Sequence, residues 1–541
     1  MCFPRGNPRH SAGLKDRLAA AQWIAGVTVL VFLAVYFRTM APTITWQNDG
    51  ADSGDLVTAA INLGVPHPSG YPLFCLIAHL FATVPGAEPA RSVNFMSALA
   101  AALAAGAVFW TALHMLADSQ CDAAPTWAGA APAIQTGGLF APVAIAWAAA
   151  GTFGFGQLLW SQATIAEVHS LHALIVALLL AAASSVSGEA RPYVLALLFG
   201  FGLANHLTIL LLLPALWPYA RVIAKWGSGR RIAAIGLCLA PGLLTYLYVP
   251  LRAAVHPVPN WGQGSTWQGF AWLVSGAAYR AYLGGLPQLH FLPRVVASAG
   301  IWVRDLGVPG LALALLGLWD GLERRTRFAW FGLSYAVLVT LYSILYSTSD
   351  SYLYLLPVGA VAAIWVARGA ALLVSGLCAW TGDGPRRRAA TALVMIVLVS
   401  MPLISAAARF QAMDVSADRE AYAFADKVLD AAAQGAIVVS SGDLQTFPLW
   451  YLRHGLEKRN DVTVVDRNLL AFEWYRSELA VQHPALSILA STRNGQEAAD
   501  ALLRVAEKHP VHLTYRDDWL LGARRWSYDG FLYSLQRPAT D

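Results

Sequence analysis

Long apolar runs alternate with short polar segments over the first three quarters of the chain. A helix needs about 20 apolar residues to cross the hydrocarbon core of a bilayer. Such runs predict membrane spans near 18–38, 92–117, 135–154, 165–185, 232–250, 305–321, 328–347, 352–376 and 389–409. The pattern therefore predicts a polytopic α-helical membrane protein.

Residues 191–222 form an apolar stretch that is too long for one upright span and carries Asn205-His206 in its middle. One tilted span would place the basic residues of 221–231 outside, whereas two short crossings would place them in the cytoplasm. The positive-inside rule favours two crossings, which gives about eleven spans, although the single tilted span stays open.

The basic residues gather in short clusters between the apolar runs. With eleven spans these clusters all face the cytoplasm: the N-terminus, Arg191, 221–231, 324–327 and 386–388. We therefore expect an integral protein of the inner (cytoplasmic) membrane with a cytoplasmic N-terminus. The polar segments on the other side are 39–90, 155–166, 251–304 and 347–350, of which 39–90 and 251–304 are large outer loops.

Charge divides the chain at about residue 409. Of its 69 Asp, Glu, Lys and Arg residues, 32 lie in 410–541, and the rest are spread thinly over 1–409. With 57% hydrophobic residues and a mean hydropathy of +0.50, the whole chain is neither a purely soluble enzyme nor disordered or fibrous. We expect a membrane domain at 1–409 and an extracytoplasmic domain at 410–541.

Short apolar runs alternate with amphipathic helical patterns in 410–541, which predicts a small, mostly parallel α/β sheet. The runs at 435–443, 461–470, 485–491 and 510–515 are the expected strands. Ligands of such sheets bind at the carboxyl ends of strands, where Ser441, Asp443 and Asp466 lie. An Asp after a strand is also commonly a helix cap, and no catalytic arrangement is visible in this domain.

Metal, cofactor and nucleic-acid signals are absent from the sequence. The five cysteines lack metal-like spacing, and the chain has neither a Gly-rich phosphate loop nor an Asp-x-Asp motif. The net charge of +5 arises from residues that mark topology, which argues against nucleic acid as a partner. We expect no metal and no cofactor.

The first outer loop contains several side chains that could take part in catalysis or binding. Asp52 and Asp55 stand three residues apart at the start of a short helical pattern, so a helix would place them on one face. His67, Tyr71 and Arg91 follow in the same segment. The alternative for the carboxylates is helix capping or simple solvation.

Other outer segments add polar groups to an otherwise apolar chain. Glu167 lies at the outer end of a span, His206 in the broken apolar stretch and Asp350 on an outer turn, while the second large loop brings Arg252, Trp261 and Tyr279. Ionisable side chains within or at the edge of a membrane span are functional candidates by default. The alternatives are a Glu that snorkels to water, polar packing between helices, a turn cap, and an anchoring belt of aromatics and Arg.

These residues carry a resemblance to a known family. The matching stretches are 52–56, 64–73, 91–99, 163–168, 202–206 and 248–252, with Trp261-Gly262 and Tyr279 beyond them. They resemble the GT-C integral-membrane glycosyltransferases, and more narrowly the bacterial relatives of the vertebrate transmembrane protein O-mannosyltransferase that modifies plexin-type domains. The family pattern usually has Glu at the position of Asp55 and an aromatic residue at that of His169.

The resemblance implies an inverting transfer of a sugar, mannose in the best-known case, from a polyprenyl-phosphate donor to a hydroxyl acceptor outside the membrane. Asp52 would be the catalytic base, since a hydroxyl needs a carboxylate to take its proton. Arg91, His206 and Arg252 would meet the leaving phosphate. The other substrate-binding candidates are Asp55, His67, Tyr71, Glu167, Trp261, Tyr279 and Asp350.

The implied partners are the lipid bilayer, the lipid-linked sugar and an exported protein whose Ser or Thr accepts the sugar. Three alternatives stay open: an envelope glycan or lipid as acceptor, a transporter or flippase of lipid-linked sugars, and a membrane scaffold for the outer domain. No internal repeat of the transporter type is visible, and the carboxylates cluster in an outer loop rather than mid-span.

Overall fold

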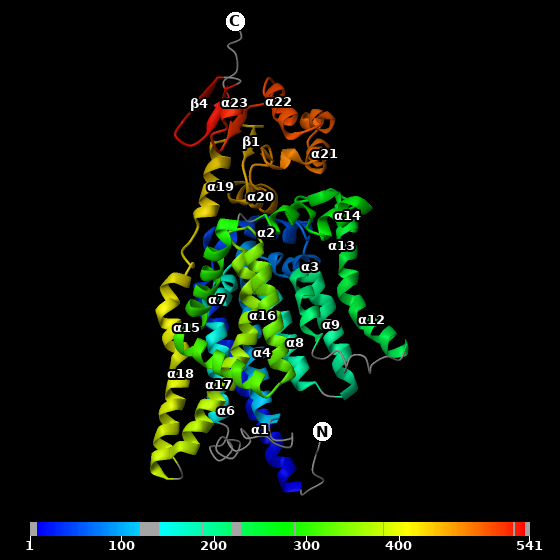
Figure 1. Cartoon of the computed structure of the whole chain (residues 1–541). Coiled ribbons are helices and arrows are strands. Elements are labelled where there is room, and N and C mark those ends of the chain that lie inside the picture. Colours follow the sequence, from blue (N-terminus) through cyan, green and yellow to red (C-terminus); the bar gives the residue numbers. More distant parts are fainter. Residues whose placement is uncertain are drawn as a thin grey trace.

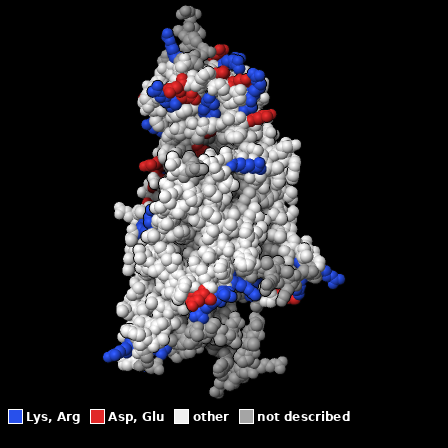
Figure 2. Space-filling view, viewed as in Figure 1, with Lys and Arg blue, Asp and Glu red and all other residues white. Residues whose placement is uncertain are grey.

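The structure is a computed structural model that describes residues 8–118, 140–186, 188–217, 229–285, 288–381, 384–522 and 525–535, with side chains from Ala20 onward except those of Ala117 and Asp118. A bundle of long helices carries a small α/β domain at one end, and α1 begins at the other end (Figure 1). Between these ends the visible bundle surface is nearly free of charged residues (Figure 2). An uncharged band of this kind is what a lipid environment requires.

The bundle is built from helices that are mostly long enough to cross a bilayer. They are α1 (Pro8–Thr39), α4 (Pro89–Asp118), α6 (Phe140–Gly154), α7 (Gln157–Ala163), α8 (Val168–Ser185), α9 (Arg191–Asn205), α12 (Gly229–Leu244), α13 (Tyr248–Ala253), α15 (Phe291–Glu323), α16 (Arg327–Leu345), α17 (Leu356–Thr381) and α18 (Pro385–Met413).

Shorter helices connect the long ones, and several of them contact the α/β domain. They are η1 (Gln47–Asp52), α2 (Ser53–Asn62), α3 (Pro72–Ala82), η3 (Leu207–Leu211), α10 (Leu212–Ala215), η6 (Trp261–Gln263), α14 (Trp267–Val274), η7 (Ala277–Tyr282) and η9 (Ser351–Leu355). Within the first outer loop, α3 has 11 residues and is too short to span a bilayer.

Among the described residues, eight helices have the length and composition of a span, or up to nine if the bent pair α6–α7 counts as one. The sequence predicted about eleven, and the difference lies in 191–222. There α9 has only 15 residues, and His206 adopts an extended conformation (φ −153°, ψ 126°) before η3 and α10. The predicted break at Asn205-His206 is confirmed, while residues 218–228 lie outside the described part.

Small residues allow the bundle helices to approach closely. Gly200 of α9 and Gly242 of α12 meet backbone to backbone, so that a Cβ on Gly242 would collide with Gly200. Alanines of α4, including Ala98, Ala101 and Ala105, are fully buried. This packing with small side chains is the usual way in which membrane helices associate without a hydrophobic driving force between them.

The helices α6 and α7 are bent by 64° relative to each other. Asp305 of α15 accepts a hydrogen bond through Oδ1 from the Leu158 N–H at 2.8 Å, which satisfies a free donor at the start of α7. Glu167 follows α7 closely along the chain and is the residue directly before α8.

The outer domain contains α19 (Glu420–Ala431), β1 (Ile437–Ser440), α20 (Asp443–Trp450), β2 (Thr463–Asp466), α21 (Glu473–Gln482), η12 (Pro484–Ser491), α22 (Gly495–Val505), β3 (Val511–Leu513), α23 (Asp518–Gly522), β4 (Trp526–Tyr528) and β5 (Tyr533–Leu535). The strand order is β2-β1-β3-β5-β4. Strands β2, β1 and β3 are parallel, with Ile437 opposite both Thr463 and Val511, and β5 and β4 add an antiparallel edge.

The predicted α/β domain is therefore present, with one strand assigned wrongly. The apolar run 485–491 is helical, because Pro484 occupies its first turn and Leu486 and Leu489, three residues apart, are its buried side chains. That spacing of apolar side chains fits a helix rather than a strand.

Candidate active site

The carboxylates of the first outer loop lie where the helical bundle meets the α/β domain. Acidic side chains are visible at this junction (Figure 2). Helix α2 begins at Ser53, so Asp52 holds the N-cap position, but its side chain makes no capping hydrogen bond. Capping thus does not account for Asp52, whose side chain is 36% exposed.

Hydrogen bonds join Asp55 to His67, and an ion-pair contact joins His67 to Asp52. The fully buried Asp55 accepts through Oδ2 from the His67 backbone N–H at 3.0 Å and lies 2.7 Å from His67 Nδ1. On the other side of the ring, His67 Nε2 lies 3.5 Å from Asp52 Oδ2. Asp55 therefore orients the imidazole, and the imidazole faces Asp52.

His67 supplies a positive charge between the carboxylates of Asp52 and Asp55. Burial alone would lower the pKa of His67, but the carboxylates of Asp52 and Asp55 raise it to about 10, so the ring carries a proton at neutral pH. Enclosure raises the pKa of Asp52, while the charge of His67 lowers it and those of Asp55 and Asp350 raise it, for a net upward shift. A carboxylate with a raised pKa and one exposed edge is suited to accept a proton.

The second outer loop reaches the same point through Trp261. Its indole Nε1–H donates to Asp55 Oδ1 at 3.2 Å, and its ring lies 6.3 Å from that of His67. Val65 pairs with the backbone around Asn260, since its N–H donates to Pro259 O and its carbonyl accepts from the Trp261 N–H. The predicted residues Asp55, His67 and Trp261 thus form one contact network.

The α/β domain contributes a wall that the predicted residue set lacks. Phe447 of α20 stacks on His67 with ring centroids 6.4 Å apart and an interplanar angle of 12°, and Trp450 packs against Trp261. Gly54 gives α20 room, because a Cβ there would collide with the backbone of Phe447. No pattern in the sequence indicated Phe447, which lies far from the first loop along the chain.

Asp443 begins α20, as the carboxyl-edge argument placed it. Its position in the recess between domain and bundle, together with the charge of Asp52, raises the pKa of Asp443 to about 7. The Trp46 indole N–H donates to the carbonyl of the next residue, Leu444, at 2.9 Å, which ties the start of α20 to the first loop. Asp443 is thus a further carboxylate within the electrostatic reach of Asp52, besides Asp55 and Asp350.

Glu167 lies at the head of α8 and is 4% exposed. Its Oε2 accepts from the Val168 N–H at 3.3 Å, whereas Oε1 is buried and has no hydrogen-bond partner. The charges of Asp52, His67 and Asp350 all act on Glu167. A buried oxygen left without a partner is costly, so Glu167 Oε1 is free to accept one further hydrogen bond.

His206 lies in a group of rings next to Tyr71. The Tyr71 ring stacks on His206 at 6.1 Å and meets His67 edge-on at 5.2 Å. His206 also faces three residues outside the predicted set: His169, His172 and Tyr354. The predicted residues His67, Tyr71 and His206 are therefore neighbours, and Tyr71 connects them.

Two further predicted residues surround the cluster. The charges of Asp52 and Asp55 act on Tyr279, whose ring stacks on Tyr282 at 6.1 Å. Asp350 precedes η9, and its backbone carbonyl accepts from the Leu353 N–H. The charge of Asp350 also raises the pKa of Asp52, so Asp350 is both a turn residue and part of the electrostatic surroundings of Asp52.

The two predicted arginines lie outside this network. Arg252 donates from Nε to Leu63 O at 2.8 Å and from a terminal nitrogen to Asn62 O at 3.1 Å, so it holds the C-terminal end of α2. Arg91 is exposed, with its guanidinium carbon 5.7 Å from the centroid of the Phe37 ring. The expectation that they meet a phosphate beside Asp52 receives no support from these contacts.

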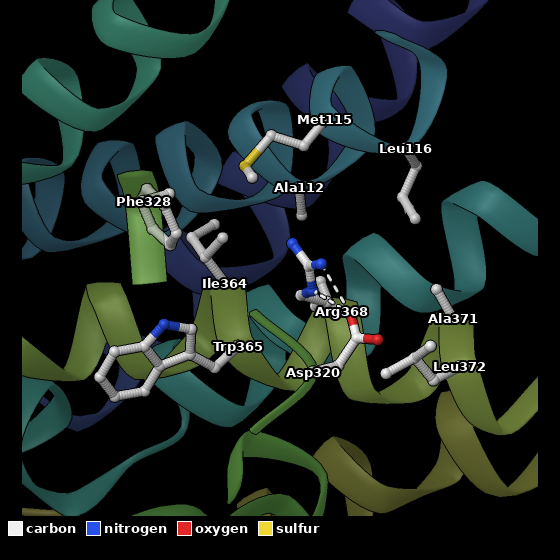
Figure 3. A pocket seen from close by; sticks show the side chains of 11 residues that line it. Ala112, Met115, Leu116, Asp320, Phe328, Ile364, Trp365, Arg368, Ala371 and Leu372 are labelled. Atoms are coloured by element: carbon white, nitrogen blue, oxygen red, sulfur yellow. Dashed lines mark hydrogen bonds and ion pairs between the residues drawn. The ribbon is translucent and has the colours of Figure 1, made fainter. Parts of the chain in front are cut away.

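The described residues contain no group of three or more His, Cys, Asp or Glu arranged to hold a metal ion. A cavity of about 70 Å³ lies between α4, α15, α16 and α17, and Arg368 donates to Asp320 at 2.7 Å beside Trp365 in its lining (Figure 3). It contains none of the predicted site residues. The Asp52 network is therefore the candidate active site.

Two family models match segments of this chain. The family model described as the Protein O-mannosyl-transferase TMEM260 N-terminal domain matches residues 52–226 and so begins at Asp52. A second model, TMEM260-associated domain 2, matches 421–494 in the α/β domain.

Two curated relatives extend over most of the chain. The chain is similar to Protein O-mannosyl-transferase TMEM260 of Mus musculus, with 26% identity over 506 residues that cover 88% of the chain and 68% of the relative. The protein of the same name from Dictyostelium discoideum is 22% identical over 510 residues, or 83% of the chain, and the match spans 58% of that relative.

Solved structures share the fold. ArnT from Cupriavidus metallidurans bound to undecaprenyl phosphate superposes with a TM-score of 0.52 at 13% identity, covering 96% of this chain and 99% of ArnT. The apo state of ArnT gives a TM-score of 0.54 at 12% identity, covering 96% and 98%. The comparisons confirm the predicted GT-C fold, the resemblance to the O-mannosyltransferase group and the enzyme class, a glycosyltransferase.

Proposed function

We propose that this chain transfers mannose from a polyprenyl-phosphate donor to Ser or Thr hydroxyls of exported proteins, outside the inner membrane. The carrying observation is the Asp52 side chain, which makes no capping bond, keeps one edge open and faces a protonated His67. The names of the two curated relatives support a protein acceptor, and the undecaprenyl phosphate in the ArnT structure supports a lipid-linked donor.

In the proposed reaction the acceptor oxygen attacks the anomeric carbon as Asp52 takes the hydroxyl proton. The bond from the anomeric carbon to the phosphate oxygen breaks on the opposite side, and the polyprenyl phosphate leaves with the electron pair. Configuration at the anomeric carbon is therefore inverted. A positioned general base of this kind contributes roughly 10² to 10⁴ in rate.

The neighbouring residues have distinct roles in this proposal. The positive charge of His67 keeps Asp52 ionised enough to act as a base, and Asp55 with Trp261 fixes the ring. His206 and its neighbours face the leaving phosphate, which needs hydrogen-bond donors as its charge develops. The unpartnered oxygen of Glu167 accepts from a sugar hydroxyl.

The test is transfer of labelled mannose from polyprenyl-phosphate mannose to a Ser/Thr-containing peptide by purified full-length protein. Asp52→Asn should reduce kcat by a factor of about 10² or more, because the amide cannot take the proton. The matched control is Asp49→Asn, three residues earlier, whose carboxylate bonds to Tyr352 instead of His67. Unchanged transfer by Asp52→Asn would remove Asp52 as the base.

We further propose that the α/β domain faces the extracytoplasmic side and that the basic end of the bundle faces the cytoplasm. In intact cells, an impermeant thiol reagent should then label Ser491→Cys in the outer domain and leave Arg388→Cys unlabelled. Labelling at 388 without labelling at 491 would reverse the orientation. The same donor assay with envelope glycans in place of peptide tests the alternative acceptor class.

A further inference from the structure

A second pocket lies in the α/β domain, apart from the Asp52 network. It is an open cavity of about 380 Å³ lined by Ser441, Arg467, Asn468, Ala471, Tyr515 and Asp517. These residues follow β1, β2 and β3, so the cavity occupies the carboxyl edge of the three parallel strands. Open α/β sheets bind their ligands at this edge.

The walls of the pocket are held in place by hydrogen bonds. Asp466 accepts through Oδ1 from the Asn468 and Leu469 N–H groups at 2.7 and 2.8 Å, and through Oδ2 from the Gly442 N–H at 3.0 Å. This one carboxylate therefore joins the loops after β1 and β2. Across the cavity, Asp517 accepts from the Tyr515 hydroxyl at 2.9 Å and pairs with Arg467 Nε at 3.3 Å.

Several donors that line the pocket make only long bonds within the chain. The exposed Asn468 donates to Ser441 Oγ at 3.4 Å, and the terminal nitrogens of Arg467 reach Gly495 O at 3.4 Å and Gln496 Oε1 at 3.5 Å. Such distances lie at the limit of a hydrogen bond, so these donors can serve a ligand at little cost. The lining carboxylate, by contrast, is already engaged.

The pocket lies beside the candidate active site. Ser441 in its lining precedes Asp443 by two residues, a separation of at most about 7 Å along an extended chain. Asp443 opens α20, whose Phe447 stacks on His67. The pocket also belongs to the domain beyond the helical bundle (Figure 1), so its occupant arrives from water rather than from lipid.

We propose that this pocket binds the acceptor polypeptide on one side of the reacting hydroxyl. The inference rests on the proposed function and names the part of the acceptor that the domain holds. Asn468 and Arg467 donate to backbone carbonyls, which an extended peptide presents about every 3.3 Å. The one carboxylate of the lining, Asp517, already accepts from Tyr515 and pairs with Arg467, so the lining suits peptide carbonyls better than the hydroxyl protons of a glycan.

The test compares a long and a minimal acceptor with the full-length protein. The long acceptor is a peptide of about ten residues around one Thr, which reaches ~33 Å when extended, and the minimal acceptor is N-acetyl-threonine amide. Asn468→Ala should raise KM for the peptide roughly three- to tenfold, the value of one hydrogen bond, and leave kcat/KM for the minimal acceptor and KM for the donor unchanged. The matched control is Arg504→Ala, on the exposed face of α22.

A binding readout separates this proposal from the proposed function. A photoreactive benzoylphenylalanine at position 468 should crosslink to the biotinylated peptide, and excess unlabelled peptide should compete, whether or not any sugar is transferred. Equal losses with both acceptors, or crosslinking that a glycan prevents and the peptide does not, would overturn the proposal. Crosslinking without transfer by wild type would instead count against the proposed chemistry alone.

Discussion

The ring of Phe447 lies nearly parallel to the imidazole of His67, with an interplanar angle of 12° and centroids 6.4 Å apart. The two residues belong to different parts of the molecule, since Phe447 lies in the α/β domain and His67 in the first outer loop. The outer domain therefore forms one wall of the candidate active site and limits how far the imidazole can turn.

Loss of this wall should impair transfer more than substrate binding. Phe447→Leu keeps an apolar side chain but removes the flat face against His67, so we expect kcat to fall several-fold while KM for the donor changes little. Steady-state kinetics on equally folded preparations measure this. Phe328→Leu, in the cavity at the far end of the bundle, is the control, and an equal fall in kcat for both variants would refute the positioning role.

Variants of Asp55 and Trp261 should show whether these residues position His67 for catalysis or only stabilise the fold. Asp55→Asn turns one acceptor of the buried carboxylate into a donor that opposes either His67 or Trp261, so kcat should fall at least tenfold. Trp261→Phe removes only the indole N–H and should have a smaller effect on kcat. If the two variants lost stability in a thermal melt without a loss of kcat, Asp55 would be a purely structural residue.

The acid limb of the pH profile should move in opposite directions in two variants. The positive charge of His67 lowers the pKa of Asp52, so His67→Gln should raise that pKa and shift the acid limb to higher pH. The charge of Asp350 raises the pKa of Asp52, so Asp350→Asn should shift the limb to lower pH. The measurement is log kcat/KM against pH, which reports the ionisations of the free enzyme.

Shifts of the same sign in both variants would contradict these electrostatics. A wild-type profile without an acid limb would instead remove Asp52 as the group that must be ionised. Asp49→Asn serves again as the control, since the charge of Asp49 is absent from the interactions that shift Asp52.

Arg252 should prove structural. Arg252→Gln removes donors from the carbonyls of Asn62 and Leu63 at the end of α2, which should cost about 1–3 kcal/mol of stability and lower the melting temperature. The fall in kcat should stay far smaller than that of Asp52→Asn. Arg280→Gln, at an exposed arginine that donates to Ser275, is the control, and a raised KM for the donor in Arg252→Gln alone would restore the phosphate role.

The sequence could predict those parts of the site whose residues lie close together along the chain. Asp52, Asp55 and His67 lie within 16 residues of each other, and helical spacing already places the two carboxylates on one face. Their meeting requires only one short helix and the turn after it. Trp261 was reached by the resemblance of its segment rather than by spacing.

The remaining contacts depend on how distant segments pack, which periodicity does not encode. Nothing in the local sequence of Arg252 indicates that α2 would end beside it and take its guanidinium. Phe447 lies in a short apolar run, 447–450, that is buried throughout, and its contact with His67 exists only after the domain docks. The fold was easier to predict, because span length and charge distribution are properties of each segment by itself.

The contact between His67 and Phe447 also has a consequence in time. The two residues are 380 positions apart. At the usual synthesis rate of about 5–20 residues per second, roughly 20 to 75 s pass between their emergence from the ribosome. During that interval every membrane helix can insert while the imidazole beside Asp52 still lacks its wall, so a newly made molecule gains full activity only when its last quarter has folded.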